Sequence, residues 1–382
     1  MNHHRGGRTG SKQISRTAAA IAFSAALSLG FTWPWEMGDP WPGTSETPVA
    51  PLERPAPEER AAAIDVDPAE GYRFAVFGDQ RALADGEWQR MIAHIDSIDR
   101  AGPPILFLVD TGDIVYNGTH TDQFAMLREI LAPVERLPYL VAAGNHEVWN
   151  NKSDAARAHT ARFLAGLDPA LGPERLYFSE RVGPALFLFL DTNDMVYGGG
   201  RNERVPAQIA WLQERLAARE EGVRTVIVVM HHPILQSSEK HRSEAAKLWN
   251  ADHGGRRLVD LFLDGGVDLI LTGHTHTYER FRIERAGGGA LDLVNLSGRP
   301  RNDLFWFGHR SRRARSFAGR EKEWLESKGW RIDEGWRITQ EEVMTGEGAD
   351  QFGLFTVGPD GAIDAEILFL GDDAPGGLRR GF

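Results

Sequence analysis

The stretch ILFLVDTGDIVY, residues 105–116, carries the pattern that decides the fold. Five apolar residues in succession precede Asp110, and the turn Thr111-Gly112-Asp113 follows. A strand with one face in water alternates apolar and polar residues, whereas an unbroken apolar run indicates a strand covered on both faces. We therefore predict a buried strand here, with a carboxylate where it ends.

Five further segments repeat this apolar run that stops at Gly, Asp, Asn or His. They are YRFAVFGD (72–79), PYLVAAGNHE (138–147), ALFLFLDTN (185–193), TVIVVMHH (225–232) and VDLILTGHTH (267–276). Apolar residues at helical spacing occupy the segments between them, at 86–100, 121–136 and 206–219. The alternation predicts an α/β fold with a mostly parallel or mixed sheet flanked by helices. QFGLFTVGPDGAIDAEILFL (351–370) predicts a closing hairpin that turns at residues 359–361.

The composition limits the kinds of protein and site that this chain can form. The 382 residues, 42% hydrophobic and 25% charged, suffice for one large or two average globular domains. The net charge of −11 argues against a nucleic-acid scaffold, because such domains are usually basic. The chain has no cysteine, which excludes disulfides, thiolate metal sites and cysteine nucleophiles. A metal site must therefore use oxygen and nitrogen ligands.

The first seventy residues have the composition of a targeting segment and a linker. Four basic residues precede the uncharged run TAAAIAFSAALSLGF (17–31), which is shorter than the roughly twenty residues of a membrane span. We expect residues 1–30 to be a signal peptide or an N-terminal anchor, which predicts export to the periplasm or the exterior, with a membrane tether if the segment is retained. A start codon assigned too far upstream is the alternative. Residues 31–70 are expected to be a Pro-rich linker, and the folded domain is expected at 71–372.

The predicted strand ends carry a set of side chains suited to metal binding. The active sites of such sheets lie beyond the carboxyl ends of the strands, and five of the six ends have residues of metal-ligand type. Each fragment alone fits a structural role, such as a helix cap, a turn or a buried histidine. Their succession is more specific: Gly-Asp, Gly-Asp-x-x-Tyr, Gly-Asn-His-Glu, Val-x-x-His and Gly-His-x-His occur in this order.

This ordered set resembles that of the calcineurin-like metallophosphoesterases, from about Tyr72 to about Leu370. The resemblance implies two mixed β-sheets packed face to face and flanked by helices, with a dinuclear metal centre at the strand ends. Two ions about 3.5–4 Å apart stabilise the attacking and leaving oxygens of phosphoryl transfer, and metal-bound water supplies hydroxide near neutral pH. The resemblance implies Fe, Zn or Mn ions and a small phosphorylated substrate.

The same resemblance assigns roles to individual residues. Asp113 would bridge the two ions, one held with Asp79 and His276 and the other with Asn145, His231 and His274. His146 would protonate the leaving group or stabilise the transition state. Glu147 is expected to orient a histidine through a hydrogen bond. Since adjacent strand residues face opposite sides, His231 is expected to bind metal and His232 is not.

The chain departs from the family pattern at its first motif. Most members have Asp-x-His there, but this chain has Asp79-Gln80-Arg81, and arginine cannot coordinate a cation. Tyr116 is a candidate replacement, because GDIVY and GHTHTYER are similar to the purple acid phosphatase branch, in which this tyrosine binds ferric iron; the alternative is a packed loop tyrosine. Arg81 either contacts the substrate phosphate or forms a salt bridge. His241 is a candidate substrate-facing histidine.

Three functions remain open at this point. The leading prediction is an exported phosphatase acting on phosphomonoesters. The second is a phosphodiesterase or nucleotidase, and the third is a non-catalytic binding module on the same fold. Within an Arg- and aromatic-rich insertion at 299–350, the segment 299–320 has seven arginines and one acidic residue. It would form either a lid over an anionic substrate or a solvated surface segment.

Overall fold

The computed structural model describes residues 48–52, 64, 71–81, 87–198, 203–298, 316–317, 319–343, 350–370 and 375–381. The predicted signal peptide, most of the predicted linker and residues 299–315 of the arginine-rich segment lie outside this range. No helix within the described part of the chain combines the length and apolar character needed to cross a membrane.

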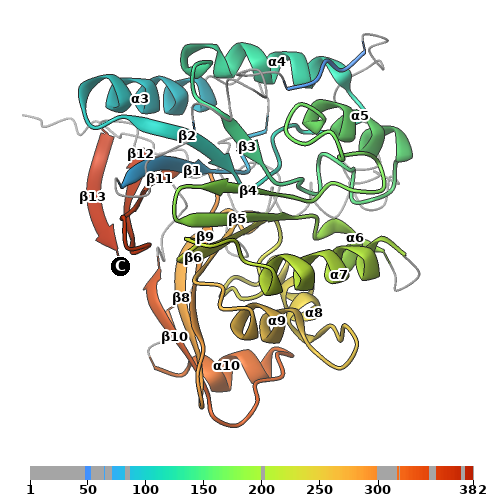
Figure 1. Cartoon of the computed structure of the whole chain (residues 1–382), viewed down its shortest axis with the longest axis vertical. Coiled ribbons are helices and arrows are strands. Elements are labelled where there is room, and N and C mark those ends of the chain that lie inside the picture. Colours follow the sequence, from blue (N-terminus) through green and yellow to red (C-terminus); the bar gives the residue numbers. More distant parts are fainter. Residues whose placement is uncertain are drawn as a thin grey trace, which may run out of the picture. The chain divides into compact units, whose positions relative to one another are not determined.

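Two mixed β-sheets form the centre of the fold, as predicted (Figure 1). The first sheet has the strand order β13-β12-β11-β1-β2-β3, in which β1, β2 and β3 are parallel. The second has the order β10-β8-β9-β7-β6-β5-β4, in which β5, β6, β7 and β9 are parallel. The strands are β1 Tyr72–Phe77, β2 Ile105–Asp110, β3 Tyr139–Val141, β4 Phe178–Val182, β5 Ala185–Leu190, β6 Thr225–Met230, β7 Leu269–Thr272, β8 Tyr278–Arg285, β9 Ala290–Leu296, β10 Trp336–Val343, β11 Asp350–Val357, β12 Ile363–Leu370 and β13 Pro375–Gly381.

Helices cover the outer faces of the sheets, with α3, α4 and α5 on the side of the first sheet and α6 to α9 on the side of the second (Figure 1). The predicted helix at 121–136 ends earlier as an α-helix, at Leu131, and continues as the 3₁₀ turn η1. Pro133 lies in that turn and has no amide proton to extend the α-helical hydrogen bonds. The helices are α3 Glu87–Ala101, α4 Thr121–Leu131, η1 Ala132–Val134, α5 Asp154–Leu164, α6 Asn193–Tyr197, α7 Arg204–Ala217, α8 Arg242–Asn250, α9 Leu258–Asp264 and α10 Glu321–Ser327.

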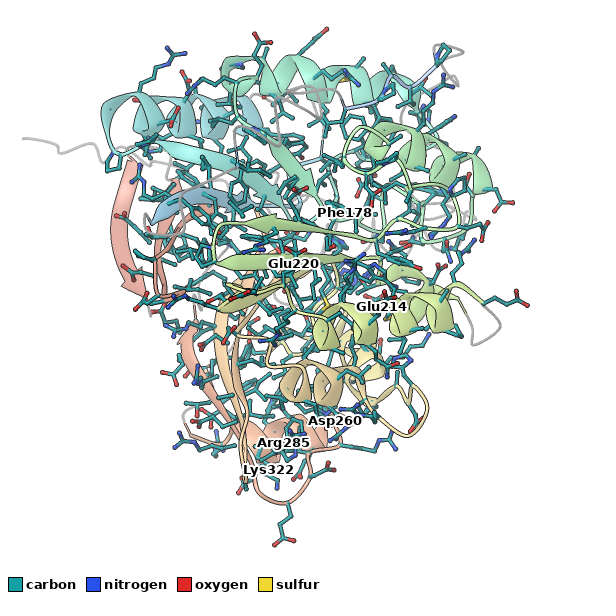
Figure 2. The ribbon with its side chains drawn as sticks, viewed as in Figure 1. Phe178, Glu214, Glu220, Asp260, Arg285 and Lys322 are labelled. Atoms are coloured by element: carbon teal, nitrogen blue, oxygen red, sulfur yellow. The ribbon has the colours of Figure 1, made fainter. Side chains whose placement is uncertain are left out.

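Aromatic side chains join the two sheets. The ring of Phe187 on β5 lies edge-on to Phe74 of β1 and Phe107 of β2, with ring centroids 5.3 and 5.4 Å away. The neighbours of Phe187 along the strand, including Leu188, point the other way, into a core shared with the helices of the second sheet. In Figure 2, Phe178 lies among these inner layers, whereas Glu214 of α7 is exposed. The unbroken apolar runs of the sequence therefore reflect strands that are buried on both faces.

The strands end where the chain leaves the strand conformation: β1 ends directly before Gly78, where its apolar run was predicted to stop, whereas β3 ends two residues before its run does. The segment expected at 138–147 is a strand only from Tyr139 to Val141, and β1 stops at Phe77. Asp79 and Asp113 then adopt positive φ angles of 62° and 60°, which no β-strand tolerates. The chain turns at these points, and its polar side chains collect at the ends of the strands.

Candidate metal centre

The predicted ligands come from both sheets and meet where their parallel strands end. Asp79, Asp113 and Asn145 follow β1, β2 and β3 of the first sheet. The histidines come from the second sheet, His231 after β6 and both His274 and His276 after β7. All six side chains are buried, none more than 7% exposed. The sheet packing thus brings together residues separated by almost 200 positions in the chain.

Three donor atoms, from Asn145, Asp113 and His274, lie around Nε2 of His231. Its Nε2 lies 3.0 Å from Oδ1 of Asn145, 3.3 Å from Oδ1 of Asp113 and 3.1 Å from Nδ1 of His274. Atoms that bind one ion at about 2.1 Å are about 3.0–3.4 Å from one another in octahedral and tetrahedral arrangements. The distance from Nε2 of His231 to each of its three neighbours therefore fits two ligands that share one metal ion.

Hydrogen bonds around the site point the lone pairs of these atoms inward. Nδ1 of His231 lies 2.9 Å from the carbonyl oxygen of Thr111, so the neutral ring carries its proton there and its lone pair on Nε2. The amide nitrogen of Asn145 donates to Oδ1 of Asn150 at 2.8 Å, which turns Oδ1 of Asn145 toward His231. Acceptors facing one another without a proton between them repel, and a cation removes that repulsion.

Glu244 orients His274, the remaining ligand, and its role was not predicted from the sequence. Its Oε2 lies 2.6 Å from Nε2 of His274 and 2.8 Å from Nδ1 of His241. A proton on Nε2 of His274 leaves the lone pair on Nδ1, which faces His231. The only sequence signal was its position three residues after His241 at the start of α8, which is equally typical of a charge on the surface of a helix.

Asp79 and His276 form a second group beside this point. Oδ1 of Asp79 lies 3.6 Å from Nε2 of His276, and Oδ2 of Asp79 accepts from the backbone N–H of His274 at 2.7 Å. Oδ1 of Asp79 and Oδ2 of Asp113 have no hydrogen-bond donor within the described part of the chain. Buried carboxylate oxygens without donors fit a neighbouring cation. Arg81 supplies one such charge, because its Nη2 lies 3.5 Å from Oδ2 of Asp113.

His146, Tyr116 and His241 surround the two groups. The Nδ1 atom of His146 is hydrogen-bonded to the carbonyl oxygen of Tyr116, and its Nε2 lies 3.7 Å from Oδ2 of Asp113. The side chain of His146 is 18% exposed, unlike that of His231, which is fully buried. The Tyr116 ring lies beside His146, with centroids 5.5 Å apart, and its centroid is 5.8 Å from Cζ of Arg81. The ring of His241 is 3.9 Å from that of His274.

His232 lies beside the donor atoms, although the alternation along a strand predicted that it faces the other side: its ring centroid is 4.4 Å from that of His274, and His231, His232 and His274 offer ligand atoms within 4.8 Å of one another. Nδ1 of His232 lies 2.7 Å from the hydroxyl of Thr192 and its Nε2 lies 3.3 Å from that of Tyr197. Both ring nitrogens therefore have hydroxyl partners, and burial, with a smaller effect of His231, lowers the pKa of His232 well below its ordinary value. It is a neutral residue of the wall of the site.

Glu147 does not orient a histidine, so this prediction was wrong. Its carboxylate accepts three backbone N–H groups: Oε2 from Asp113 at 2.8 Å and Gly144 at 2.7 Å, and Oε1 from Val115 at 3.0 Å. These partners are backbone amides of the two turns after β2 and β3. Glu147 thus joins the loops after β2 and β3 and fixes the distance between Asp113 and Asn145.

The electrostatics of the site favour a bound cation. Burial raises the pKa of Asp113, but His231, His146 and Arg81 together overcome this and hold it well below its ordinary value. Burial, and the charges of His241 and other histidines, lower the pKa of His274. Burial is also the main cause that raises the pKa of Asp79 to about 6. An ionised Asp113 and a neutral His274 are the protonation states that metal ligands need.

The backbone is strained at the ligands. His274 and His276 have φ angles of 71° and 55°, a conformation that costs a residue other than glycine about 1–3 kcal/mol. A glycine precedes both Asn145 and His274 because other chain segments come very close there. A Cβ on Gly144 would lie 2.3 Å from the backbone nitrogen of Asp113, and one on Gly273 would lie 2.5 Å from Oδ2 of Asp79. Strain of this kind accumulates at functional sites.

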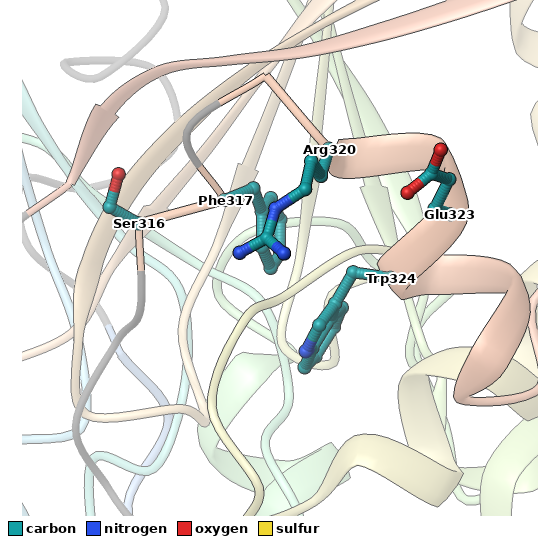
Figure 3. A pocket seen from close by; sticks show the side chains of 5 residues that line it. All are labelled: Ser316, Phe317, Arg320, Glu323 and Trp324. Carbon is teal, nitrogen blue, oxygen red and sulfur yellow. The ribbon is translucent and has the colours of Figure 1, made fainter.

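A cavity of about 400 Å³ includes the described end of the arginine-rich segment (Figure 3). Phe317 and Trp324 of α10 lie together there, with ring centroids 4.7 Å apart. The cavity contains no predicted metal ligand; it is lined by Ser316, Phe317, Arg320, Glu323 and Trp324. Because residues 299–315 lie outside the described part, the lid stays a prediction.

The chain is similar to known phosphatases. The chain is 30% identical to purple acid phosphatase 21 of Arabidopsis thaliana over 216 residues, which are 55% of this chain and 45% of that protein. It is 32% identical to human acid phosphatase type 7 over 187 residues, 45% of this chain and 40% of that one. The chain thus spans less than half the length of these two relatives.

The fold is also found in a solved structure. A purple acid phosphatase from yellow lupin seeds superposes with a TM-score of 0.54 at 17% identity, over 82% of this chain and 54% of that one. The family model of the calcineurin-like phosphoesterases matches residues 72–278, more than half of the chain. That match runs through every strand end that supplies a donor atom, from Asp79 to His276, and the chain therefore belongs to the calcineurin-like phosphoesterase family.

Proposed function

We propose that this protein is a metal-dependent hydrolase of small phosphate esters and that phosphomonoesters are its preferred substrates. The observation that carries the proposal is the position of donor atoms from Asn145, His274 and Asp113 at 3.0, 3.1 and 3.3 Å from Nε2 of His231. Imidazole, amide and carboxylate ligands suit zinc, iron or manganese. The relatives named above, which are phosphatases by name, support the same chemistry.

A metal ion held by this set supplies a Lewis acid that activates water for attack on phosphorus. Two ions are implied by the family resemblance, and the donors around His231 fit one of them. The other would need Asp79, Asp113 and His276, with Tyr116 as the proposed fourth ligand. Since Arg81 lies among these atoms, they fit a metal ion less well than the donors around His231 do.

His146 is the residue placed to move a proton. The Tyr116 carbonyl holds the Nδ1 side of its ring, so Nε2 is the atom that gains and loses a proton toward the open side of the site. Nε2 lies 3.7 Å from Oδ2 of Asp113. His146 would then donate the Nε2 proton to the departing alkoxide, which general acid catalysis requires. We assign substrate contacts to Arg81 and His241 on the strength of their places beside the donors.

The basic start of the chain and the uncharged run at 17–31 support a further proposal, that the protein is exported. Sequencing the N-terminus of the protein isolated from its native host, together with cell fractionation, tests this. Recovery of the full-length chain in the cytoplasm would contradict it.

Hydrolysis by purified protein tests the proposed reaction. We expect turnover of p-nitrophenyl phosphate to exceed that of bis(p-nitrophenyl) phosphate, to vanish on chelation and to return with zinc or manganese. Asp113→Ala should lower the rate by roughly 100-fold or more, because it removes a ligand and the charge that holds Arg81 and His146. Faster hydrolysis of the diester would favour the phosphodiesterase alternative. Full activity without metal, or no hydrolysis of either ester by the metal-loaded protein, would contradict the proposal.

A further inference from the structure

The guanidinium of Arg81 lies among the atoms that the first ion of a dinuclear centre would need. Its Nη2 lies 3.4 Å from Nε2 of His276 and 3.5 Å from Oδ2 of Asp113. His276 in turn lies 3.6 Å from Oδ1 of Asp79. The positive charge of Arg81 therefore lies next to His276 and Asp113, two proposed ligands of one ion, and Asp79, the third, lies next to His276.

This placement is fixed by the backbone. Arg81 donates its backbone N–H to the carbonyl of Asp113 at 2.9 Å, and Asp79 donates to the carbonyl of Gly112 at 2.8 Å. Arg81 adopts a left-handed φ of 47° and its side chain is only 8% exposed. The loop after β1 is thus tied to the loop after β2, and the guanidinium is directed into the site.

Guanidinium and metal ion compete for the same anionic oxygen. Arginine stays protonated and has no lone pair, so Nη2 cannot act as a ligand. A divalent ion bound by Asp79, Asp113 and His276 would face this charge at close range in a buried site, where repulsion is poorly screened. On Asp113, the guanidinium lies 3.5 Å from Oδ2, whereas Oδ1 is the oxygen that lies 3.3 Å from Nε2 of His231.

We propose that Arg81 takes the place of the first metal ion, so that the centre combines one metal ion, held by Asp113, Asn145, His231 and His274, with one fixed guanidinium. The inference rests on the proposed metal-dependent function. Arg81 neutralises Oδ2 of Asp113 and presents N–H donors to phosphoryl oxygens, as a second ion would present its charge. It supplies no Lewis acid for water, and that role falls to the single metal ion.

Metal stoichiometry tests this inference independently of activity. The metal-free protein would be titrated with Zn²⁺, with bound metal counted by mass spectrometry, and the Mn²⁺-loaded protein would be studied by electron paramagnetic resonance. We expect one tightly bound ion per chain in the wild type and the spectrum of an isolated Mn²⁺. Arg81→Gly removes the charge and suits the positive φ, so it should bind a second ion at least about tenfold more tightly and show a coupled pair of Mn²⁺ ions.

Arg81→Lys is the matched control, because it keeps a positive charge at the same position; it should bind one ion. Tyr116→Phe should also leave the count at one. Two tightly bound ions in the wild type would overturn the inference but would leave the proposed hydrolase function intact. A violet tyrosinate–iron absorption that is lost in Tyr116→Phe would have the same consequence. A wild type that binds no ion would overturn both. A folded Arg81→Gly variant, judged by thermal unfolding, that still binds only one ion would also refute the role of the charge.

Discussion

Oε2 of Glu244 lies 2.6 Å from Nε2 of His274, and this contact selects the nitrogen that His274 presents to the donor set. The same oxygen accepts from His241 at 2.8 Å, so one carboxylate orders two histidines. Both desolvation and these contacts act on Glu244: burial raises its pKa, but the hydrogen bonds from His241 and His274 dominate and hold the pKa well below its ordinary value. The carboxylate is therefore ionised and a strong acceptor.

Glu244→Ala should weaken metal binding by about 10- to 100-fold, because His274 loses the acceptor that fixes its tautomer. Competition with a chelator for Zn²⁺ measures the dissociation constant. Glu244→Gln keeps an acceptor oxygen in a side chain of the same shape and should recover much of the affinity. Equal affinity of the wild type and Glu244→Ala would show that Glu244 does not position His274.

His146→Gln should reduce kcat by about 100-fold and leave the metal content unchanged. The side chain of His146 is 18% exposed and is not one of the proposed ligands around His231, so the variant loses a proton donor and keeps the ligands. Turnover and metal content would be measured on the same preparation. His94→Gln, which changes a histidine on α3, should leave both unchanged. If His146→Gln lost its metal together with its activity, His146 would be a ligand.

Gly144→Ala should destabilise the protein by at least about 1–3 kcal/mol and reduce metal binding. The added Cβ would lie 2.3 Å from the backbone nitrogen of Asp113 and 2.4 Å from its Oδ1, so the loops after β2 and β3 must separate. Urea unfolding gives the loss of stability. A Cβ on Gly172 would have no other atom within 4 Å, so Gly172→Ala is the matched control with an expected change near zero. Wild-type stability and affinity in Gly144→Ala would contradict the close approach.

The buried Glu279 should make stability depend on pH. Burial raises its pKa from the ordinary 4.5 to about 7, although Ser237 and Thr277 donate hydrogen bonds that lower it. The folded state holds the proton more tightly than the unfolded state. This contribution to stability is therefore complete below about pH 4.5, is lost as the pH rises toward 7 and stays lost above it.

The free energy of unfolding of Glu279→Gln minus that of the wild type should consequently increase by about 3 kcal/mol as the pH rises from 4 to 8. Urea unfolding of both proteins across this range measures the difference, and other titrating groups cancel in the comparison. Glu214→Gln, at an exposed position of α7, should show a difference that does not vary with pH. A difference for Glu279→Gln that is constant with pH would show that folding does not raise the pKa of Glu279.

Much of the fold follows from local sequence because its strands are buried on both faces. Unbroken apolar runs predicted β1, β2, β5, β6 and β7, and the turn at 359–361 predicted the antiparallel pairing of β11 with β12. Strand lengths were predicted less well. The apolar run before Asn145 continues through Ala142 and Ala143, but pairing in β3 stops at Val141 because the chain turns toward the site.

The sequence by itself determined which residue types stand at the strand ends, in what order, and that Arg81 breaks the first motif. Only the tertiary structure decided what these residues do. Glu147 binds backbone amides, Glu244 fixes His274, and the charge of Arg81 lies between His276 and Asp113. Periodicity and motif spacing report on neighbours along one chain segment, whereas these contacts join loops of two sheets. Their distances depend on how the sheets pack and on left-handed turns that no local pattern specifies.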